Sequence, residues 1–164
     1  MFKLELKTDL SDLKKLTKKY PEASRRAREA KIEEALLLLE AAVIKKTPYG
    51  AGPIHLRDTI HHKLSVIGNK VAGILGTPIE HGEPVEMGTK PHFPPVEPIQ
   101  FWVEKKLGYE GKEAASVAFL IARAISKRGT EGAKMFEEGF EENEGKVIMI
   151  LNEIPGEIER MVAI

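Results

Sequence analysis

The stretch from Val85 to Leu107 reads VEMGTKPHFPPVEPIQFWVEKKL, and it changes character twice. Its first three residues are typical of the end of an extended segment, and Gly88-Thr89 predicts a turn because glycine readily adopts a positive φ. Three prolines then exclude both a helix and a central strand, since each lacks an N–H and fixes its own φ: Pro91, Pro94 and Pro95. The stretch therefore predicts a strand end followed by a proline-rich loop.

A short amphipathic helix is expected directly after this loop. Pro98 suits the first helical position, and Gly108 suits the position after the last. The apolar face between them is formed by Ile99, Trp102, Val103 and Leu107. Trp102 could join Phe101 and Phe93 in a recognition patch. An indole at an apolar helix position is more often a core anchor, and we favour that interpretation.

The residues at the start of the chain predict one strand and two helices. Apolar residues alternate with charged ones over residues 2–6, which is typical of a half-buried strand. A short lysine-rich helix is expected from Leu10 to about Tyr20, where Pro21 stops it. The longest helix is expected from Pro21 to about Lys46, and its broad apolar stripe makes it the main core helix.

The middle of the chain predicts a β-hairpin and a third extended segment. Residues 47–53 carry two prolines and two glycines and predict a loop. The apolar residues after it fit a strand or a helix, and we favour a strand from about Ile60, because Gly68-Asn69 is typical of a hairpin turn into a second strand at residues 71–75. Residues 77–89 are expected to form an edge strand or a bulged one.

Two helical regions are expected after Leu107. Residues 113–127 have a narrow alanine-rich face suited to close helix packing, and Gly129 ends this helix. From Met135 to Met161 the apolar residues suggest a helix that is interrupted near Pro155-Gly156. Together these patterns predict an α+β fold: a small antiparallel sheet packed against the long helix of the N-terminal half, with additional shorter helices. We expect one domain over residues 1–164, in which the helical segment 143–164 could be peripheral.

Composition excludes several classes of function. The 164 residues include 25 Lys and Arg and 25 Asp and Glu, so the formal net charge is zero, which disfavours a module dominated by phosphate neutralisation. The chain has no cysteine, which excludes disulfides, thiolate catalysis and zinc–sulfur sites and fits an intracellular place of synthesis. The sequence has no apolar run near 18 residues and no signal segment, so we expect neither a membrane span nor export.

The charges are distributed unevenly along the chain. Residues 12–31 contain eight basic and three acidic residues, whereas residues 131–160 contain three basic and nine acidic residues. Cations near the start of a helix are mildly unfavourable, so we expect acidic residues of the C-terminal segment near the basic half of the long helix. The basic segment 14–31 could alternatively contact DNA, although it lacks interleaved aromatic residues.

No pattern of residues predicts an active site. The five histidines lie in the central third of the chain, but none forms a metal-binding pair at helical spacing, and His61 and His62 would point to opposite faces of a strand. Four carboxylates near the proline loop could do acid–base chemistry, but nothing marks one as buried: Glu80, Glu83, Glu86 and Glu97. The Gly-Thr pairs at 76–77, 88–89 and 129–130 belong to no phosphate-binding motif. We expect no catalytic, cofactor or metal residues.

The order of several short motifs resembles a known family. The motifs are Phe2-Lys-Leu-Glu-Leu-Lys, Leu10-Ser-Asp-Leu-Lys-Lys-Leu, Thr47-Pro48 with Leu56-Arg57-Asp58-Thr59-Ile60, Val85-Glu86-Met87-Gly88-Thr89 with Pro91-His92-Phe93-Pro94-Pro95, Trp102, Ile121-Ala122-Arg123-Ala124-Ile125 and Lys127-Arg128-Gly129-Thr130. In this order they are similar to the small minor tail components of long-tailed bacteriophages and prophages. This gene-product-ten-like family is also described as tail-completion or head–tail joining proteins. Two places depart from its pattern: residues 79–82 before the Glu-x-Gly-Thr turn, and the loop after Thr47.

The resemblance implies a structural protein and not an enzyme. Its structural signature falls on Glu86, Gly88, Thr89, Trp102 and Gly129. The partner-binding residues that we expect are those of the proline loop, a stiff arm suited to docking: Lys90, Pro91, His92, Phe93, Pro94 and Pro95. The implied partners are tail-tube and head-connector proteins, with several copies in a ring, in the virion tail and in the host cytoplasm during assembly.

Overall fold

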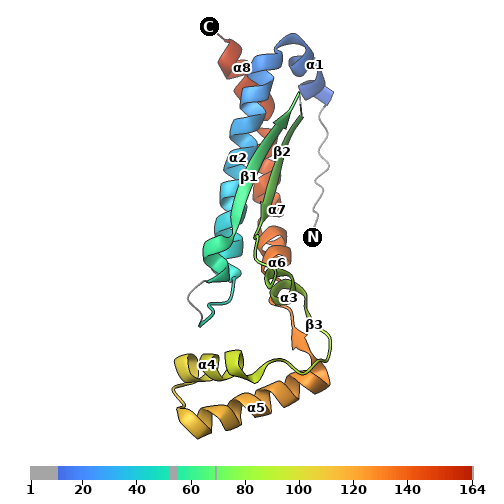
Figure 1. The fold of residues 1–164 in the computed structure, drawn as a ribbon. Coiled ribbons are helices and arrows are strands. Elements are labelled where there is room, and N and C mark those ends of the chain that lie inside the picture. Colours follow the sequence, from blue (N-terminus) through green and yellow to red (C-terminus); the bar gives the residue numbers. More distant parts are fainter. Residues whose placement is uncertain (1–10, 52–54, 69, 164) are drawn as a thin grey trace. The chain divides into compact units, whose positions relative to one another are not determined.

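The computed structural model describes residues 11–51, 55–68 and 70–163, and it has the expected α+β fold (Figure 1). The strand predicted at residues 2–6 lies outside the described residues. The described residues divide into two compact units that interleave along the sequence: unit 1 takes in those within 11–45, 60–76 and 136–163, and unit 2 takes in those within 46–59 and 77–135. The expectation of a single domain stays a prediction.

Unit 1 is built around helix α2 (Pro21–Lys46), which has the boundaries that the sequence predicts. Pro21 lies at the first helical position, where its missing N–H costs nothing, and Glu22 complements the positive end of the helix dipole. One side of α2 is buried, through Ser24, Ala27, Ala35, Leu36 and Val43. The long helix is therefore the core element of this unit, as predicted.

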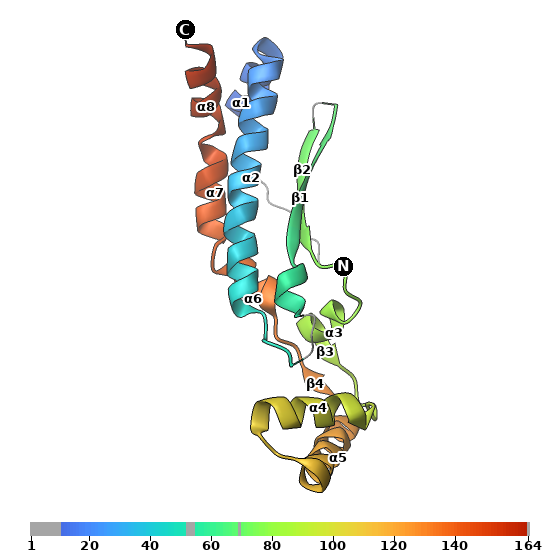
Figure 2. The same ribbon diagram turned by 60° about the vertical axis from the view of Figure 1, so that its left-hand side comes forward.

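The C-terminal helices lie alongside α2 (Figure 2). They are α6 (Met135–Glu141), α7 (Glu144–Asn152) and α8 (Ile154–Val162). Ile154 and Ile158 of α8 share a buried cluster with Ala27 and with Leu13 of α1 (Ser11–Lys19). Segment 143–164, for which a peripheral position was one possibility, thus supplies residues of this buried cluster. Its break falls at Glu153, and Pro155 lies in the first turn of α8, where a proline is tolerated.

The predicted β-hairpin is confirmed and packs against α2. Strands β1 (His61–Ile67) and β2 (Lys70–Gly76) pair antiparallel, with His61 opposite Gly76 and Ile67 opposite Lys70. A side chain at Gly73 would lie 2.5 Å from Cδ1 of Leu36, so the absence of a side chain lets the hairpin approach the helix closely. Leu56, which the pattern could place in a strand, belongs to a short 3-10 helix, η1 (Leu56–Thr59), in unit 2.

Unit 2 corrects the expected third extended segment at residues 77–89. Residues 82–87 form a helix, α3 (Gly82–Met87), and only Gly88–Thr89 is extended, as β3. Pro84 is tolerated in the first turn, and the backbone N–H of Gly88 closes the helix on the carbonyl oxygen of Pro84. The prediction that Val85 to Met87 ends a strand is therefore wrong.

Unit 2 also contains a helix hairpin, whose helices stop at the predicted glycines and begin two residues earlier than predicted. Helix α4 (Val96–Leu107) begins two residues before Pro98 and stops at Gly108, which has a φ of 74°. Helix α5 (Gly111–Arg128) stops at Gly129, which has a φ of 75°. Both glycines adopt the left-handed φ that ends helices. The strand β4 (Thr130–Glu131) follows.

Candidate interaction surface

Two Gly-Thr pairs meet in unit 2. Strands β3 and β4 pair antiparallel, with Gly88 opposite Glu131 and Thr89 opposite Thr130, and the two threonine hydroxyl groups lie 2.9 Å apart. A Cβ atom at Gly88 would overlap the backbone of residues 130–132, and one at Gly129 would overlap the carbonyl oxygen of Thr89. Because both glycines also have positive φ values, this backbone crossing requires glycine on both sides.

The residues that follow β4 form backbone hydrogen bonds with α3. The backbone N–H of Ala133 donates to the carbonyl oxygen of Val85 (2.7 Å), and that of Lys134 donates to the carbonyl oxygen of Glu86 (3.1 Å). Glu86 itself is buried, with 5% of its surface exposed. Four of the five signature residues, Glu86, Gly88, Thr89 and Gly129, therefore converge on one crossing of two segments. Their roles here are structural, because they fix where the chain enters the proline loop.

The proline loop that starts from this crossing is exposed. Lys90 to Phe93 and Pro95 are all exposed, and Pro94 is half-buried. Nδ1 of His92 donates a hydrogen bond to the carbonyl oxygen of Lys90 (2.9 Å). The Phe93 ring lies 6.1 Å from the Phe119 ring of α5, so the loop is joined to the helix hairpin through an aromatic contact.

The α4–α5 hairpin has a core made of small side chains. Val103 of α4 and Ala114 and Ala118 of α5 are fully buried against one another, with Ile99 and Ile121 packed partly buried beside them. Small residues let the two helices approach closely, but they leave little volume in which larger side chains can be enclosed. The hairpin therefore buries a narrow stripe of each helix and leaves other apolar residues outside.

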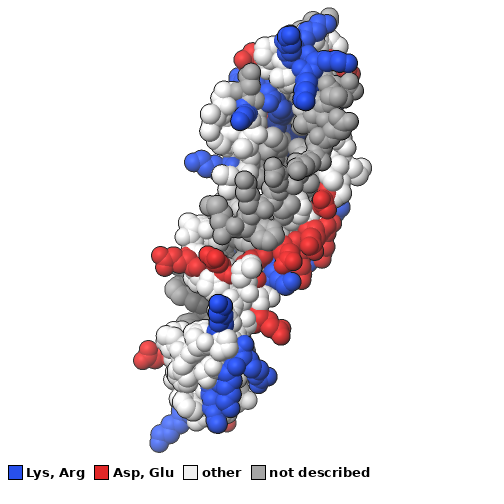
Figure 3. All heavy atoms as spheres, turned by 90° about the vertical axis from the view of Figure 1, so that its right-hand side faces the viewer, with Lys and Arg blue, Asp and Glu red and all other residues white. Residues whose placement is uncertain are grey.

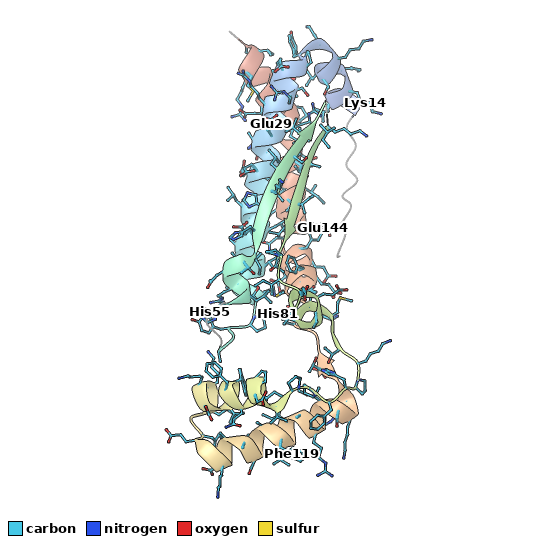
Figure 4. The ribbon with its side chains drawn as sticks, viewed as in Figure 1. Lys14, Glu29, His55, His81, Phe119 and Glu144 are labelled. Carbon is cyan, nitrogen blue, oxygen red and sulfur yellow. The ribbon has the colours of Figure 1, made fainter. Side chains whose placement is uncertain are left out.

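Several large apolar side chains are exposed on this hairpin. Trp102 is 39% exposed, Phe119 is 51% exposed and Leu120 is 61% exposed; Phe119 is labelled on α5 in Figure 4. One open hollow lies between the helices and is lined by Pro98, Ile99, Trp102 and Ile121. A second lies along α5 and is lined by Ala115, Ser116, Phe119 and Leu120. We call these residues with Phe93 the apolar hairpin surface.

The position of Trp102 corrects the interpretation that we favoured from the sequence. Val103 takes the core position facing α5, so the neighbouring indole lies on the surface, and Leu107 is exposed as well. Sequence reasoning did not single out Phe119 and Leu120. The available signal was the alanine face predicted for residues 113–127, since two large apolar residues that fall outside a helix's packing face must lie on its surface.

The basic segment 14–31 is partly neutralised within unit 1. Arg25 pairs with Glu22 (2.8 Å) and Glu29 (2.9 Å), while Lys31 pairs with Glu34 (2.8 Å) and Glu153 (2.6 Å). The hydrogen bond from Lys31 lowers the pKa of Glu153, and the pKa of Lys31 is raised in turn, chiefly by Glu153. The Lys31–Glu153 pair confirms that an acidic C-terminal residue lies beside the basic half of α2. The exposed lysines are on α1: Lys14, Lys15, Lys18 and Lys19.

The carboxylates and histidines do not converge on a chemical site. Glu80, Glu83 and Glu97 are exposed, in contrast to the buried Glu86. His55 stacks on Tyr49 with ring centroids 4.2 Å apart, and His62 contacts two glutamates of α2. Among the described residues, no group of three or more His, Asp or Glu side chains is placed to hold a metal ion.

Two further observations concern membrane-spanning helices and similarity to known proteins. No helix within residues 11–51, 55–68 and 70–163 is long and apolar enough to cross a bilayer. Comparison of the chain with models of known protein families, with curated proteins and with solved structures found no match.

Proposed function

We propose that this chain is a structural component of a bacteriophage or prophage tail, which acts at the head–tail junction by binding other proteins and carries out no chemical reaction. Its partners are the tail-tube and head-connector proteins, and its place is the virion tail, after assembly in the host cytoplasm. The proposal starts from the order of motifs between Phe2 and Thr130 that resembles tail-completion proteins.

The observation that carries the proposal is the apolar hairpin surface. Isolated exposed apolar residues are normal in soluble proteins, but adjoining ones that line open hollows mark surfaces that bind other proteins. Phe119 and Leu120 adjoin on one hollow, Trp102 lines the other, and the exposed Phe93 contacts Phe119 from the proline loop. Three prolines restrict this loop before binding, so it loses little conformational entropy when it docks.

The test is light scattering of the purified chain, alone and mixed with the tail-tube and connector proteins encoded beside it. We expect a discrete larger species with at least one neighbour, and we expect deletion of residues 91–95 to abolish it while circular dichroism shows a folded chain. The proposal fails if the chain binds neither the tail-tube protein nor the connector protein at concentrations of about 100 μM, which is well above the dissociation constants of specific interfaces.

A second candidate function is that of a DNA-contacting adaptor. It is favoured by the four exposed lysines of α1, which lie at helical spacing that places them close together (Lys14 is labelled in Figure 4). Duplex DNA would then bind with an affinity that falls steeply with salt, and the variant Lys14→Glu/Lys18→Glu would weaken it. The absence of binding at low salt excludes this candidate.

A further inference from the structure

The α4–α5 hairpin is structurally incomplete as a packing unit. Two helices cover each other along one stripe, and here that stripe consists of Val103, Ala114 and Ala118. The larger apolar residues Trp102, Phe119 and Leu120 lie outside it. Burying apolar area stabilises by about 25 cal/mol per Å², so a third packing element over these residues would be favourable.

The rim of this surface is basic. Residues 90–128 contain seven Lys and Arg against four Glu. All seven cations are exposed, and five of them lie in the C-terminal halves of the two helices: Lys105 and Lys106 in α4, and Arg123, Lys127 and Arg128 in α5. Two such hairpins placed face to face would bring like charges together, which disfavours a symmetric contact between them.

Segment 135–144 has the opposite charge. It contains five glutamates and no basic residue, and four of these carboxylates are exposed: Glu138, Glu141, Glu142 and Glu144. Figure 3 shows Asp and Glu side chains gathered on the face drawn. The segment runs through α6 into the start of α7, where Glu144 lies (Figure 4). We call it the acidic segment.

We infer that the α4–α5 hairpin of one copy of this chain docks on the acidic segment of a second copy. The inference rests on the proposed structural function and names one partner of its apolar hairpin surface. Charge complementarity between the basic rim and the acidic segment selects the second copy and fixes the orientation. Because the two surfaces differ, each copy keeps one of each available, so the contact is head-to-tail and closes into a ring when the rotation allows.

This assignment differs from the one that charge counting along the chain suggests. Residues 12–31 and 131–160 have opposite net charges, but Lys31 and Glu153 already pair within unit 1. The charges of Lys31 and Glu153 are therefore compensated inside one molecule. The basic rim of the hairpin comes from a different part of the sequence, in which acidic residues are fewer, and it is the better candidate for a contact between copies.

Charge-reversal variants of the full chain test this contact. Sedimentation velocity measures their association, alone and with the tail-tube protein. Arg123→Glu/Lys127→Glu and Glu141→Lys/Glu144→Lys should each weaken association between copies about tenfold or more. The two changes combined in one chain should restore it, since each reversed surface then meets a reversed partner. The matched control Lys14→Glu/Lys18→Glu on α1 should associate like the unchanged chain. Failure of the combined variant to recover association overturns the inference.

Cross-linking identifies the contacting surfaces directly, because the unchanged chain has no cysteine. Ser116→Cys lines the hollow on α5, and Gly145→Cys lies beside Glu144 with nothing within 4 Å of its Cβ position. With a flexible bis-maleimide reagent, differently tagged Ser116→Cys and Gly145→Cys chains should join to each other. Preferential joining of Ser116→Cys to itself, or no joining between copies in chains that still bind the tail-tube protein, overturns the inference and leaves the proposed function standing. Joining of copies in chains that bind neither neighbour supports the contact and counts against the proposed function.

Discussion

Nδ1 of His62 lies 2.6 Å from Oε2 of Glu40, and the same carboxylate oxygen accepts the backbone N–H of His62 at 2.7 Å. On the other side of the ring, Nε2 lies 2.9 Å from Oε1 of Glu33. The imidazole side chain is 13% exposed. His62 of strand β1 thus contacts two carboxylates of helix α2 that lie about two helical turns apart. These contacts join the β-hairpin to the core helix.

The His62 contacts predict that stability falls with rising pH. The hydrogen bond with Glu33, followed by that with Glu40, raises the pKa of His62 above its ordinary value of 6.5, although burial opposes the shift. The folded state therefore binds the proton more tightly than the unfolded state. The resulting stabilisation is fully present below the unfolded pKa and is lost as the pH rises through the folded pKa. Thermal unfolding at pH 6 and at pH 9 should show a lower Tm at pH 9.

The variant His62→Gln separates this effect from the titration of other groups. It should lower the Tm at pH 6 and reduce the difference in Tm between pH 6 and pH 9. His61→Gln is the matched control, because His61 is the exposed neighbour on the same strand, and it should leave the difference unchanged. An equal pH dependence in the unchanged chain and in His62→Gln would show that the His62 contacts do not cause it.

Gly129 and Gly108 provide a matched pair for testing the backbone crossing. Their φ values are 75° and 74°, but a Cβ at Gly129 would overlap the carbonyl oxygen of Thr89, whereas one at Gly108 meets nothing within 4 Å. Gly108→Ala should cost about 1 kcal/mol, from backbone strain alone. Gly129→Ala should cost more than about 3 kcal/mol, because strain and steric overlap act together. Denaturant unfolding gives both values, and equal costs would rule out a close crossing at Gly129.

Local patterns were sufficient for the long and regular elements. Helix α2 has an apolar stripe from Ile32 to Val43 and lies between a proline and a loop, and the β1–β2 hairpin has a turn signal between two apolar runs, the first of which alternates with polar residues. Helix α3 has neither advantage. It is six residues long, it contains Pro84, and its end is held by Gly88 pairing with Glu131, which no local pattern encodes. Tertiary contacts decide a segment of this length.

The candidate surface was predictable only in part. The exposed proline loop follows from composition, because three prolines prevent regular backbone pairing. The contact between Thr89 and Thr130 joins residues that are 41 positions apart. The repeated Gly-Thr pair in the sequence does not specify this contact. The exposure of Trp102 depends on which stripe of α4 faces α5. That choice is made by the small residues Ala114 and Ala118, which accommodate Val103 and not an indole.

Ile158 tests whether the C-terminal segment belongs to the core of unit 1. It is fully buried with Leu13 and Ala27, so Ile158→Ala should destabilise the chain by about 2–5 kcal/mol through lost burial and the cavity that remains. Met161 of the same helix is 37% exposed, and Met161→Ala should cost less than about 1 kcal/mol. Denaturant unfolding compares the two variants. A cost below 1 kcal/mol for Ile158→Ala would mean that α8 is peripheral after all.

Substitutions at the neighbouring residues Trp102 and Val103 of α4 should affect assembly and folding separately. Val103 is fully buried between α4 and α5, so Val103→Ala should lower stability by about 1–3 kcal/mol and affect assembly only through folding. Trp102 lines the hollow between the helices and is partly exposed, so Trp102→Ala should change stability by less than about 1 kcal/mol. Because aromatic residues in such positions dominate interface energies, the same change should weaken binding to a tail-tube or connector protein, or to a second copy, by at least about tenfold. Unfolding and light scattering on both variants measure the two effects. If Trp102→Ala lowers stability and leaves binding unchanged, the indole is a core residue and does not belong to the apolar hairpin surface.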